Sequence, residues 1–117
     1  MNLFQLGKFM LHSGDQSAFK IECDALTDTD LEALAFLIAE RVGAFGAVEG
    51  VPEGGLRLAA ALRLFVTEGP LLIVDDVYFS GASMEEHRAG RKADGYVIFA
   101  RKKLDARGWV RALFTLD

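Results

Sequence analysis

The sequence has few of the residues that hold together small secreted or metal-dependent proteins. It contains one cysteine, Cys23, so an internal disulfide is impossible, and two histidines, His12 and His87, that lie far apart in the chain. Neither histidine has a cysteine or carboxylate at the spacing of a transition-metal site. We therefore interpret Cys23 as an inert core residue and both histidines as structural or surface residues.

The sequence also lacks a long apolar run and a secretory signal. No hydrophobic stretch approaches the ~18 residues that suggest a membrane span, and MNLFQLGKFM has no basic run followed by an apolar core and a cleavage site. We therefore expect a cytoplasmic protein with no membrane partner. Hydrophobic residues make up 51% of the 117 residues, which is enough for one core, and we expect a single domain over residues 1–117.

Positive charge is scarce except near the C-terminus. The formal net charge is −4, yet residues 88–117 carry eight lysines and arginines against three aspartates. Such a basic end could serve a phosphate-rich ligand, a nucleic acid or an acidic partner surface, or it could be a solvated face. Nucleic-acid binding is the weakest of these hypotheses, and we do not expect a nucleic acid as a partner.

Hydrophobic periodicity predicts strands that alternate with helices. Apolar residues recur at helical spacing between N-cap candidates at 27–30 and a stop at Gly43. The apolar run LLIVDD, residues 71–76, does not alternate with polar residues, which is typical of a strand covered on both faces. The remaining pattern predicts strands at 44–51, 96–103 and 109–116, a turn at 105–108, and helices at 56–66 and about 82–92.

This order of elements predicts a small three-layer α/β fold, an open sheet with parallel core strands and helices on its faces. Before the first helix, FMLHSG and SAFKIEC, residues 9–14 and 17–23, predict a hairpin with Gly14 at its bend. Ligands of open α/β sheets bind beyond the carboxyl ends of the strands. Two acidic, glycine-bearing loops are expected there, VEGVPEGG at 48–55 and DDVYFSGAS at 75–83.

The second of these loops suits a sugar phosphate. Asp75 and Asp76, expected at the strand end, can accept hydrogen bonds from vicinal hydroxyls or hold Mg²⁺. The next residues, 79–83, enter a helix whose N–H groups, with the serine hydroxyls, can bind an anion. The chain has no Gly-Lys-Ser/Thr, so this is not a Walker loop. Tyr78 and Phe79 could stack on a base, but we expect them to pack beneath the loop.

LLIVDDVYFSGAS resembles the phosphoribosyl-pyrophosphate motif of type I phosphoribosyltransferases. FMLHSGDQSAFKIE is similar to the N-terminal hood of the orotate branch, VEGVPEGGLRLAAAL to its pyrophosphate loop and helix, and GYVIFARKK to a later strand near the base. The resemblance implies a Rossmann-like phosphoribosyltransferase fold, with a hood at about 1–24 and a core at 25–117. It further implies Mg²⁺ as cofactor, bound with phosphoribosyl pyrophosphate and without direct protein ligands.

The resemblance also implies a role for particular residues. The ribose would be held by Asp75 and Asp76, and the base would lie near Arg101 or Lys102, with Phe19 and Lys20 as further base candidates. The 5′-phosphate would be held by Phe79, Ser80, Gly81, Ala82 and Ser83. The pyrophosphate loop would be Glu49, Gly50, Val51, Pro52, Glu53, Gly54 and Gly55.

Three departures from the family limit what the resemblance implies about activity. Phe79 stands where the family usually has threonine, and His12 and Asp15 stand where the hood usually has basic residues. Only residues 64–71 separate the second helix from the motif strand, where the family normally has further strands and a mobile loop that carries the catalytic lysine. We therefore expect an orotate phosphoribosyltransferase-like protein that binds phosphoribosyl pyrophosphate or a nucleoside monophosphate. Whether it transfers the phosphoribosyl group, or is an inactive nucleotide-sensing or scaffold relative, stays open. The missing strands favour a homodimer.

Overall fold

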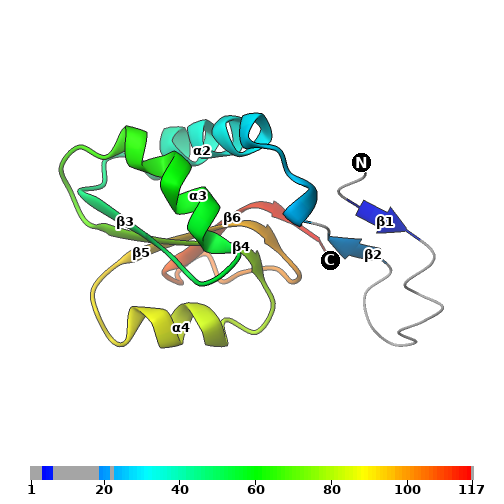
Figure 1. Ribbon diagram of the computed structural model, residues 1–117. Coiled ribbons are helices and arrows are strands. Elements are labelled where there is room, and N and C mark those ends of the chain that lie inside the picture. The colour runs from blue at the N-terminus through cyan, green and yellow to red at the C-terminus, as the bar shows by residue number, and fades with distance from the viewer. Residues whose placement is uncertain (1–3, 7–18, 22, 117) are drawn as a thin grey trace.

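Strands and helices alternate along the described part of the chain, residues 4–6, 19–21 and 23–116 of a computed structural model (Figure 1). The strands are β1 (Phe4–Leu6), β2 (Phe19–Ile21), β3 (Ala47–Gly50), β4 (Leu71–Tyr78), β5 (Asp94–Ala100) and β6 (Val110–Thr115). The helices are η1 (Cys23–Ala25), α2 (Asp28–Val42), α3 (Gly55–Leu62), η2 (Arg63–Phe65) and α4 (Ala82–Arg88), of which η1 and η2 are short 3₁₀ helices.

Four parallel strands form the main sheet, in the order β3-β4-β5-β6. The register pairs Val48 with Leu72 and Val74 with Tyr96, so apolar residues meet across the centre of the sheet. The parallel core that the sequence predicts is therefore confirmed. The turn expected at 105–108 forms, with the N–H of Gly108 donating to the carbonyl of Asp105 at 2.9 Å, and it returns the chain to a strand parallel to β5.

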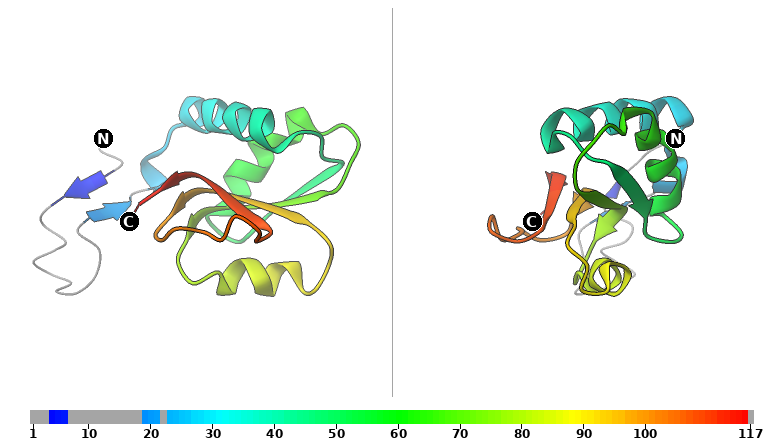
Figure 2. Two further views of the ribbon diagram at one scale, coloured as in Figure 1. Left: turned by 180° about the vertical axis from the view of Figure 1, so that it is seen from behind. Right: turned by 90° about the vertical axis from the view of Figure 1, so that its left-hand side faces the viewer.

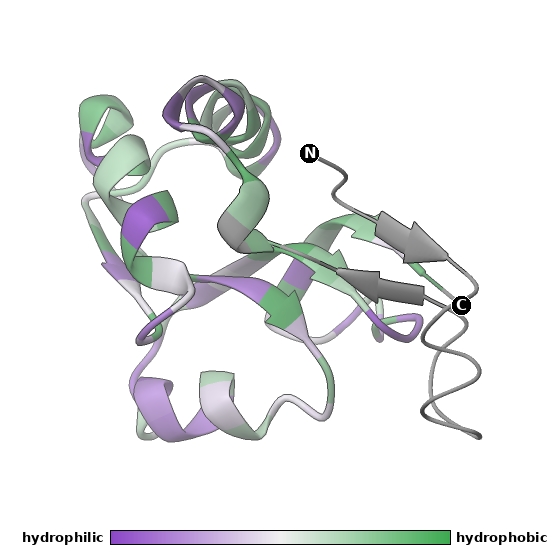
Figure 3. Cartoon of the chain, turned by 45° about the vertical axis from the view of Figure 1, so that its right-hand side comes forward, coloured by the Kyte–Doolittle hydropathy of each residue, from purple (hydrophilic) through white to green (hydrophobic). Residues whose placement is uncertain are grey.

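Helices cover both faces of this sheet. Figures 1 and 2 show α2 and α3 on one face and α4 on the other, which confirms the three-layer α/β arrangement. The face under α2 and α3 buries a large aliphatic cluster in which Ile38, Leu58, Leu62 and Leu72 are fully enclosed. Hydrophobic residues dominate the strands, whereas α4 is mostly hydrophilic (Figure 3).

Helix α2 begins and ends at the residues that the sequence indicates. The Thr27 hydroxyl accepts from the N–H of Asp30 at 3.1 Å, and the Asp30 carboxylate accepts from the N–H of Thr27 at 2.9 Å, a reciprocal capping box. Gly43 ends the helix with φ of 81°, a conformation that favours glycine.

Several predicted boundaries are wrong. Strand β4 continues to Tyr78, so Asp75 and Asp76 lie inside the strand and not at its end. Helix α4 ends at Arg88 and not near residue 92, because Ala89 and Gly90 both adopt left-handed conformations. Strand β5 ends at Ala100, so the basic residues 101–103 follow it, and the helix expected at 56–66 becomes 3₁₀ from Arg63.

The hood-like hairpin is not confirmed. Its predicted first strand, residues 9–14, lies outside the described residues. Its second strand overlaps β2, and the described partner of β2 is β1, with Gln5 opposite Lys20 in an antiparallel pair. Within the described residues, no helix is both long and apolar enough to cross a membrane.

Candidate functional site

The loop between β3 and α3 folds tightly against the middle of β4. The N–H of Val51 donates to the carbonyl of Val74 at 2.9 Å, and the N–H of Gly55 donates back to the carbonyl of Val51 at 2.8 Å. A methyl group at Gly55 would overlap the Val74 carbonyl, and one at Gly54 would overlap the Asp76 carboxylate. The glycines therefore permit this loop to lie directly on the strand that carries the paired acids.

The two acids of β4 interact with each other and with the strand backbone. The Asp75 carboxylate accepts from the N–H of Asp76, and the Asp76 carboxylate accepts from the N–H of Val77, both at 2.8 Å. Asp75 and residues 79–83, called the motif loop below, line a small hollow of about 60 Å³. Asp76 and Gly54 line a second hollow of about 180 Å³. The pair thus separates two neighbouring depressions.

Asp75 is the buried charged residue of the described core, at 8% exposure. Burial raises the pKa of Asp75 to about 7; the Asp76 side chain adds to this through its hydrogen bond and negative charge, whereas the hydrogen bond from the Asp76 backbone N–H opposes it. A carboxyl group with such a pKa can be protonated or ionised near neutral pH. Groups of this kind cluster at functional sites, and Asp75 borders the 60 Å³ hollow.

The motif loop after β4 turns at Gly81, which adopts φ of 87°. A side chain at Gly81 would overlap the Tyr78 ring, so the turn needs glycine on two counts. The Ser80 hydroxyl accepts from the N–H of Ala82 at 3.3 Å, and Ser83 borders the same small hollow as Asp75. The predicted phosphate residues therefore surround one depression next to one of the two acids.

Two cations lie directly beside this loop. The N–H of Arg101 donates to the carbonyl of Tyr78 at 2.9 Å, which ties the end of β5 to the end of β4. The Arg101 guanidinium lies over the Phe79 ring, 5.0 Å from its centroid, and the Lys102 ammonium lies 5.9 Å from the centroid of Tyr78. The predicted base candidates Arg101 and Lys102 thus adjoin the predicted phosphate loop.

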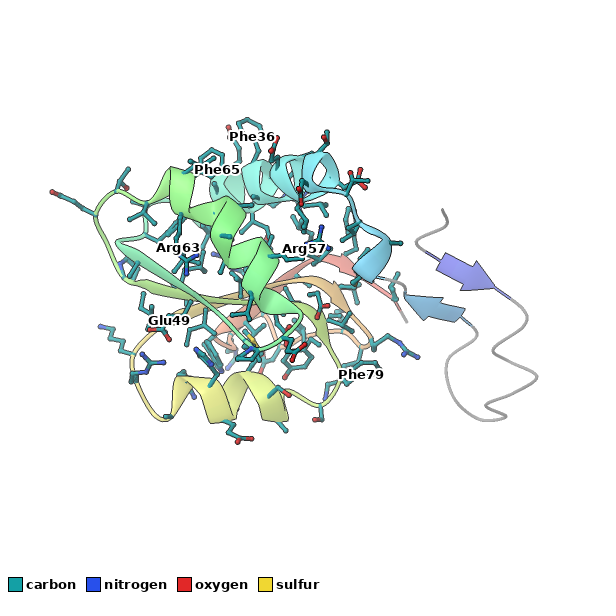
Figure 4. All side chains as sticks on the ribbon, in the orientation of Figure 1. Phe36, Glu49, Arg57, Arg63, Phe65 and Phe79 are labelled. Carbon is teal, nitrogen blue, oxygen red and sulfur yellow. The ribbon has the colours of Figure 1, made fainter. Side chains whose placement is uncertain are left out.

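The expectation that Tyr78 and Phe79 both pack beneath the loop is only half correct. Tyr78 is partly buried in the cluster on the α4 face and lies against Gly81. Phe79 is 61% exposed, and Figure 4 shows it at the edge of the molecule, near the end of β4. Phe79 therefore contributes little to the core.

Glu49 lies in β3, where its carboxylate is occupied by His87, at the far end of α4, and by Arg91, three residues beyond that helix. Arg91 donates to both carboxylate oxygens at 2.9 and 3.0 Å, and His87 Nε2 lies 2.9 Å from Oε1. These hydrogen bonds, those of Arg91 above all, lower the pKa of Glu49 to about 2. The sequence did not reveal this cluster, because its members are 38 and 42 residues apart.

Two depressions flank the pyrophosphate-loop candidate. One, of about 430 Å³, is lined by Val51, Pro52, Ser83, Glu86 and His87. The other is the 180 Å³ hollow at Asp76, whose polar wall also includes Glu53 and Arg57 (Figure 4). Phe19 and Lys20 lie in β2, and their side chains are outside the part of the structure that is described.

The described residues contain no group of three or more histidines, cysteines or carboxylates that could hold a metal ion by themselves. Mg²⁺ commonly binds through one or two carboxylates and the phosphates of a substrate, so the expected Mg²⁺ does not require such a group. Asp75 and Asp76 are the carboxylates at the motif loop that fit such a role.

Comparison with known proteins places this fold among solved structures. UMP synthase from Leishmania donovani matches with a TM-score of 0.70 and 19% identity, over 97% of this chain and 34% of that chain. Xanthine-guanine-hypoxanthine phosphoribosyltransferase from Helicobacter pylori matches with a TM-score of 0.46 and 18% identity, over 75% of this chain and 78% of that one. No protein-family model matches the sequence, and no curated protein matches it significantly.

The likeness to UMP synthase shows the fold. The chain spans about a third, 34%, of the length of the UMP synthase chain that it matches. Together with the order of the strands, this likeness shows that the chain shares its parallel α/β fold with a part of that UMP synthase chain.

Proposed function

We propose that this protein binds a phosphoribosyl compound, either phosphoribosyl pyrophosphate or a nucleoside monophosphate, at the edge formed by the ends of β3, β4 and β5. The observation that carries the proposal is the contact between the Asp76 carboxylate and the backbone at Gly54. This contact brings the acids of β4 close to residues 50–55, called the glycine loop below. A ligand with a ribose between two phosphate groups requires such an arrangement.

Each part of the edge has a chemical role in this proposal. Asp75 and Asp76 accept hydrogen bonds from the ribose hydroxyls, and residues 79–83 hold the 5′-phosphate through backbone N–H groups and serine hydroxyls. Gly50–Gly55 face the pyrophosphate, and Mg²⁺ enters with that group. Glu49 is excluded from this set because Arg91 and His87 already occupy its carboxylate.

The cations beyond β5 are the proposed contacts for the base. Arg101 and Lys102 follow Ala100 and lie beside the motif loop, so a base joined to the ribose would meet them. Orotate, which carries a carboxylate, suits such cations and is our proposed base. Transfer of the phosphoribosyl group to orotate is the corresponding enzymatic reaction.

A catalytically inactive nucleotide-binding protein is the second candidate. The observation that favours it is the short connection between η2 and β4, which consists of residues 66–70 only. This connection is tied down, because the N–H of Thr67 donates to the carbonyl of Phe45 at 2.9 Å. Phosphoribosyl transfer depends on stabilising the departing pyrophosphate and on excluding water, and this connection offers neither a cation nor a cover.

A homodimer is proposed as the assembly. Phe36, Leu37 and Leu64 are exposed on α2 and η2, and Phe36 and Phe65 line a hollow of about 350 Å³ (Figure 4). The rings of these two phenylalanines lie 6.3 Å apart, edge to face. An isologous contact between two such faces would remove the apolar side chains from water.

Calorimetry with phosphoribosyl pyrophosphate and Mg²⁺ tests the binding proposal. We expect Asp75→Asn/Asp76→Asn to weaken binding by roughly 10- to 100-fold, since a carboxylate offers the ribose hydroxyls two acceptor oxygens and an amide offers only one. A matched control, Glu32→Gln/Glu40→Gln, removes two exposed carboxylates from α2 and should bind as the wild type does. Equal affinity in the aspartate variant and the control would refute the proposal.

An assay of orotidylate formation separates the two candidates. Turnover that disappears in Asp75→Asn/Asp76→Asn establishes a transferase. Binding without turnover, at enzyme concentrations well above the ligand Kd, establishes the inactive relative.

A further inference from the structure

The Phe79 side chain is largely exposed, and packing in the fold does not require an aromatic ring at this position. It is 61% exposed, although a phenylalanine ring gains more from burial than almost any other side chain. Its neighbours in the loop are small or polar residues, and Tyr78, directly before it, is partly buried on the α4 face. Packing therefore does not account for an aromatic ring at position 79.

The ring is nevertheless held in a defined position. Arg101 lies over it at 5.0 Å from the ring centroid, and the backbone of Arg101 is fixed by its hydrogen bond to the Tyr78 carbonyl. A guanidinium stacked on an aromatic ring restricts both groups and leaves the rest of the ring surface open. Phe79 and Arg101 thus form a cation–π pair at the rim of the site, called the platform below.

The platform adjoins the groups that would hold the remainder of a nucleotide. Phe79 borders the same 60 Å³ hollow as Asp75 and Ser83. This hollow is far smaller than the roughly 300–1,000 Å³ of pockets that enclose drug-sized ligands. It can take a phosphate group but not a nucleobase, so a base attached to a phosphate bound there must lie outside it, on the rim.

We propose that Phe79, steadied by Arg101, is the stacking surface for the nucleobase of a nucleoside 5′-monophosphate. This inference rests on the proposed function, because residues 80–83 and Asp75 must hold the phosphate and ribose of the same ligand. Stacking accepts any planar base, so Phe79 contributes to the binding of purine and pyrimidine nucleotides alike, in addition to the contacts of a base carboxylate with Arg101 or Lys102.

The test compares ligands that differ only in the base. Titration calorimetry with uridine 5′-monophosphate, adenosine 5′-monophosphate and ribose 5-phosphate measures how much the base adds to affinity. We expect Phe79→Leu to weaken both nucleotides by roughly 5- to 100-fold, the usual loss for one stacked base. Ribose 5-phosphate should change by less than about twofold, because it makes no stacking contact.

Two further variants guard against indirect effects. Phe79→Tyr keeps the ring and should keep the base contribution, whereas Phe36→Leu removes an aromatic ring that is 51% exposed on α2 and should change no affinity. Phe79→Thr adds a hydroxyl near the phosphate. We expect it to bind ribose 5-phosphate at least as tightly as the wild type while losing the base contribution.

Distinct results overturn each proposal. If ribose 5-phosphate and both nucleotides bind to the wild type, and Phe79→Leu weakens all three equally or none of them, Phe79 is no stacking surface and only this inference fails. If the wild type binds none of the three ligands, the proposed function fails together with it. If Phe79→Thr tightens the nucleotides and ribose 5-phosphate alike, the aromatic ring is an impediment to phosphate binding and the inference is wrong.

Discussion

The two faces of the sheet are covered by helices that are fastened in different ways. On one face, α2 and α3 bury a continuous set of aliphatic side chains, with Ile38, Leu58 and Leu62 fully enclosed. On the other face, α4 is seven residues long and buries Met84 alone among its own residues. Its remaining contacts are largely polar: Glu49 binds Arg91 and His87, and Glu85 accepts from both Arg88 and the Trp109 indole.

This difference bears on the proposed site because each helix begins at one of its two loops. The glycine loop leads into α3, which apolar burial holds in place regardless of salt or pH. The motif loop leads into α4, which is held largely by charged groups whose attraction falls with ionic strength. The position of the phosphate residues should therefore respond to solution conditions more than the position of the glycine loop does.

The largest expected effect concerns the aliphatic face. Leu58→Ala should lower the free energy of unfolding by about 2–5 kcal/mol, because Leu58 is fully buried in α3 and its removal leaves a cavity. Denaturant unfolding followed by circular dichroism measures this loss. Leu56→Ala, in the same helix at 49% exposure, is the matched control and should change stability by less than about 1 kcal/mol. Equal losses in the two variants would contradict the view that burial fastens this face.

The next effect concerns Asp75 and depends on pH. The pKa of Asp75 is raised in the folded state, from 3.8 to about 7, so the folded protein binds its proton more tightly than the unfolded chain does. The contribution of Asp75 to the free energy of unfolding should therefore be greatest below pH 4 and should be lost as the pH rises through about 7. We expect roughly 1–3 kcal/mol for this decline.

Asp75→Asn removes the titrating group and serves as the check. Its stability should be nearly constant between pH 5 and about 8, and it should exceed that of the wild type at the upper end of this range. Thermal unfolding at a series of pH values measures both curves. A wild-type stability that rises across the same pH interval would show that ionisation of Asp75 does not destabilise the fold.

Much of the fold could be predicted from local patterns. The unbroken apolar run of β4 indicated a strand covered on both faces, and the threonine–aspartate pair at Thr27 and Asp30 indicated where α2 begins. Both signals are short-range, so a single sequence carries them. The left-handed end of α4 was also signalled, by Gly90, but that glycine was not used as a stop.

The parts that could not be predicted depend on distant residues. The Glu49 cluster joins β3 to the far end of α4, and nothing in the neighbourhood of Glu49 indicates Arg91. The partial burial of Tyr78 and the much greater exposure of Phe79 likewise depend on how the loop turns at Gly81. The motif itself identified the residues of the candidate site, but their contacts required the fold.

A smaller effect tests how α4 is fastened. Glu49→Gln should lower stability by about 1 kcal/mol at pH 7, a modest value because the Glu49 side chain is 40% exposed to solvent. The pKa of Glu49 is lowered from 4.5 to about 2, so its contribution is present above pH 4.5 and is lost as the pH falls through about 2. This interval lies below the one in which Asp75 titrates.

Unfolding measurements at low and high salt check the charged nature of this contact. The difference between wild type and Glu49→Gln should shrink at 1 M salt, where the screening length is about 3 Å. Ribose 5-phosphate affinity should fall modestly in the same variant, since α4 carries the proposed phosphate loop. A difference that is independent of salt would mean that Glu49 acts through packing.

The smallest expected effect on folding is that of Leu64→Ser, on the outer side of the aliphatic face. Leu64 is 82% exposed, so the substitution should change the stability of the isolated chain by less than about 0.5 kcal/mol. If the proposed homodimer forms through this surface, the same substitution should raise the dissociation constant several-fold, because an apolar side chain buried between subunits is replaced by a polar one. Sedimentation velocity across a dilution series measures the assembly, and unfolding at low concentration measures the fold. A large loss of stability with unchanged association would show that Leu64 belongs to the core. Leu64 would then stabilise the folded chain and would not form part of a surface between subunits.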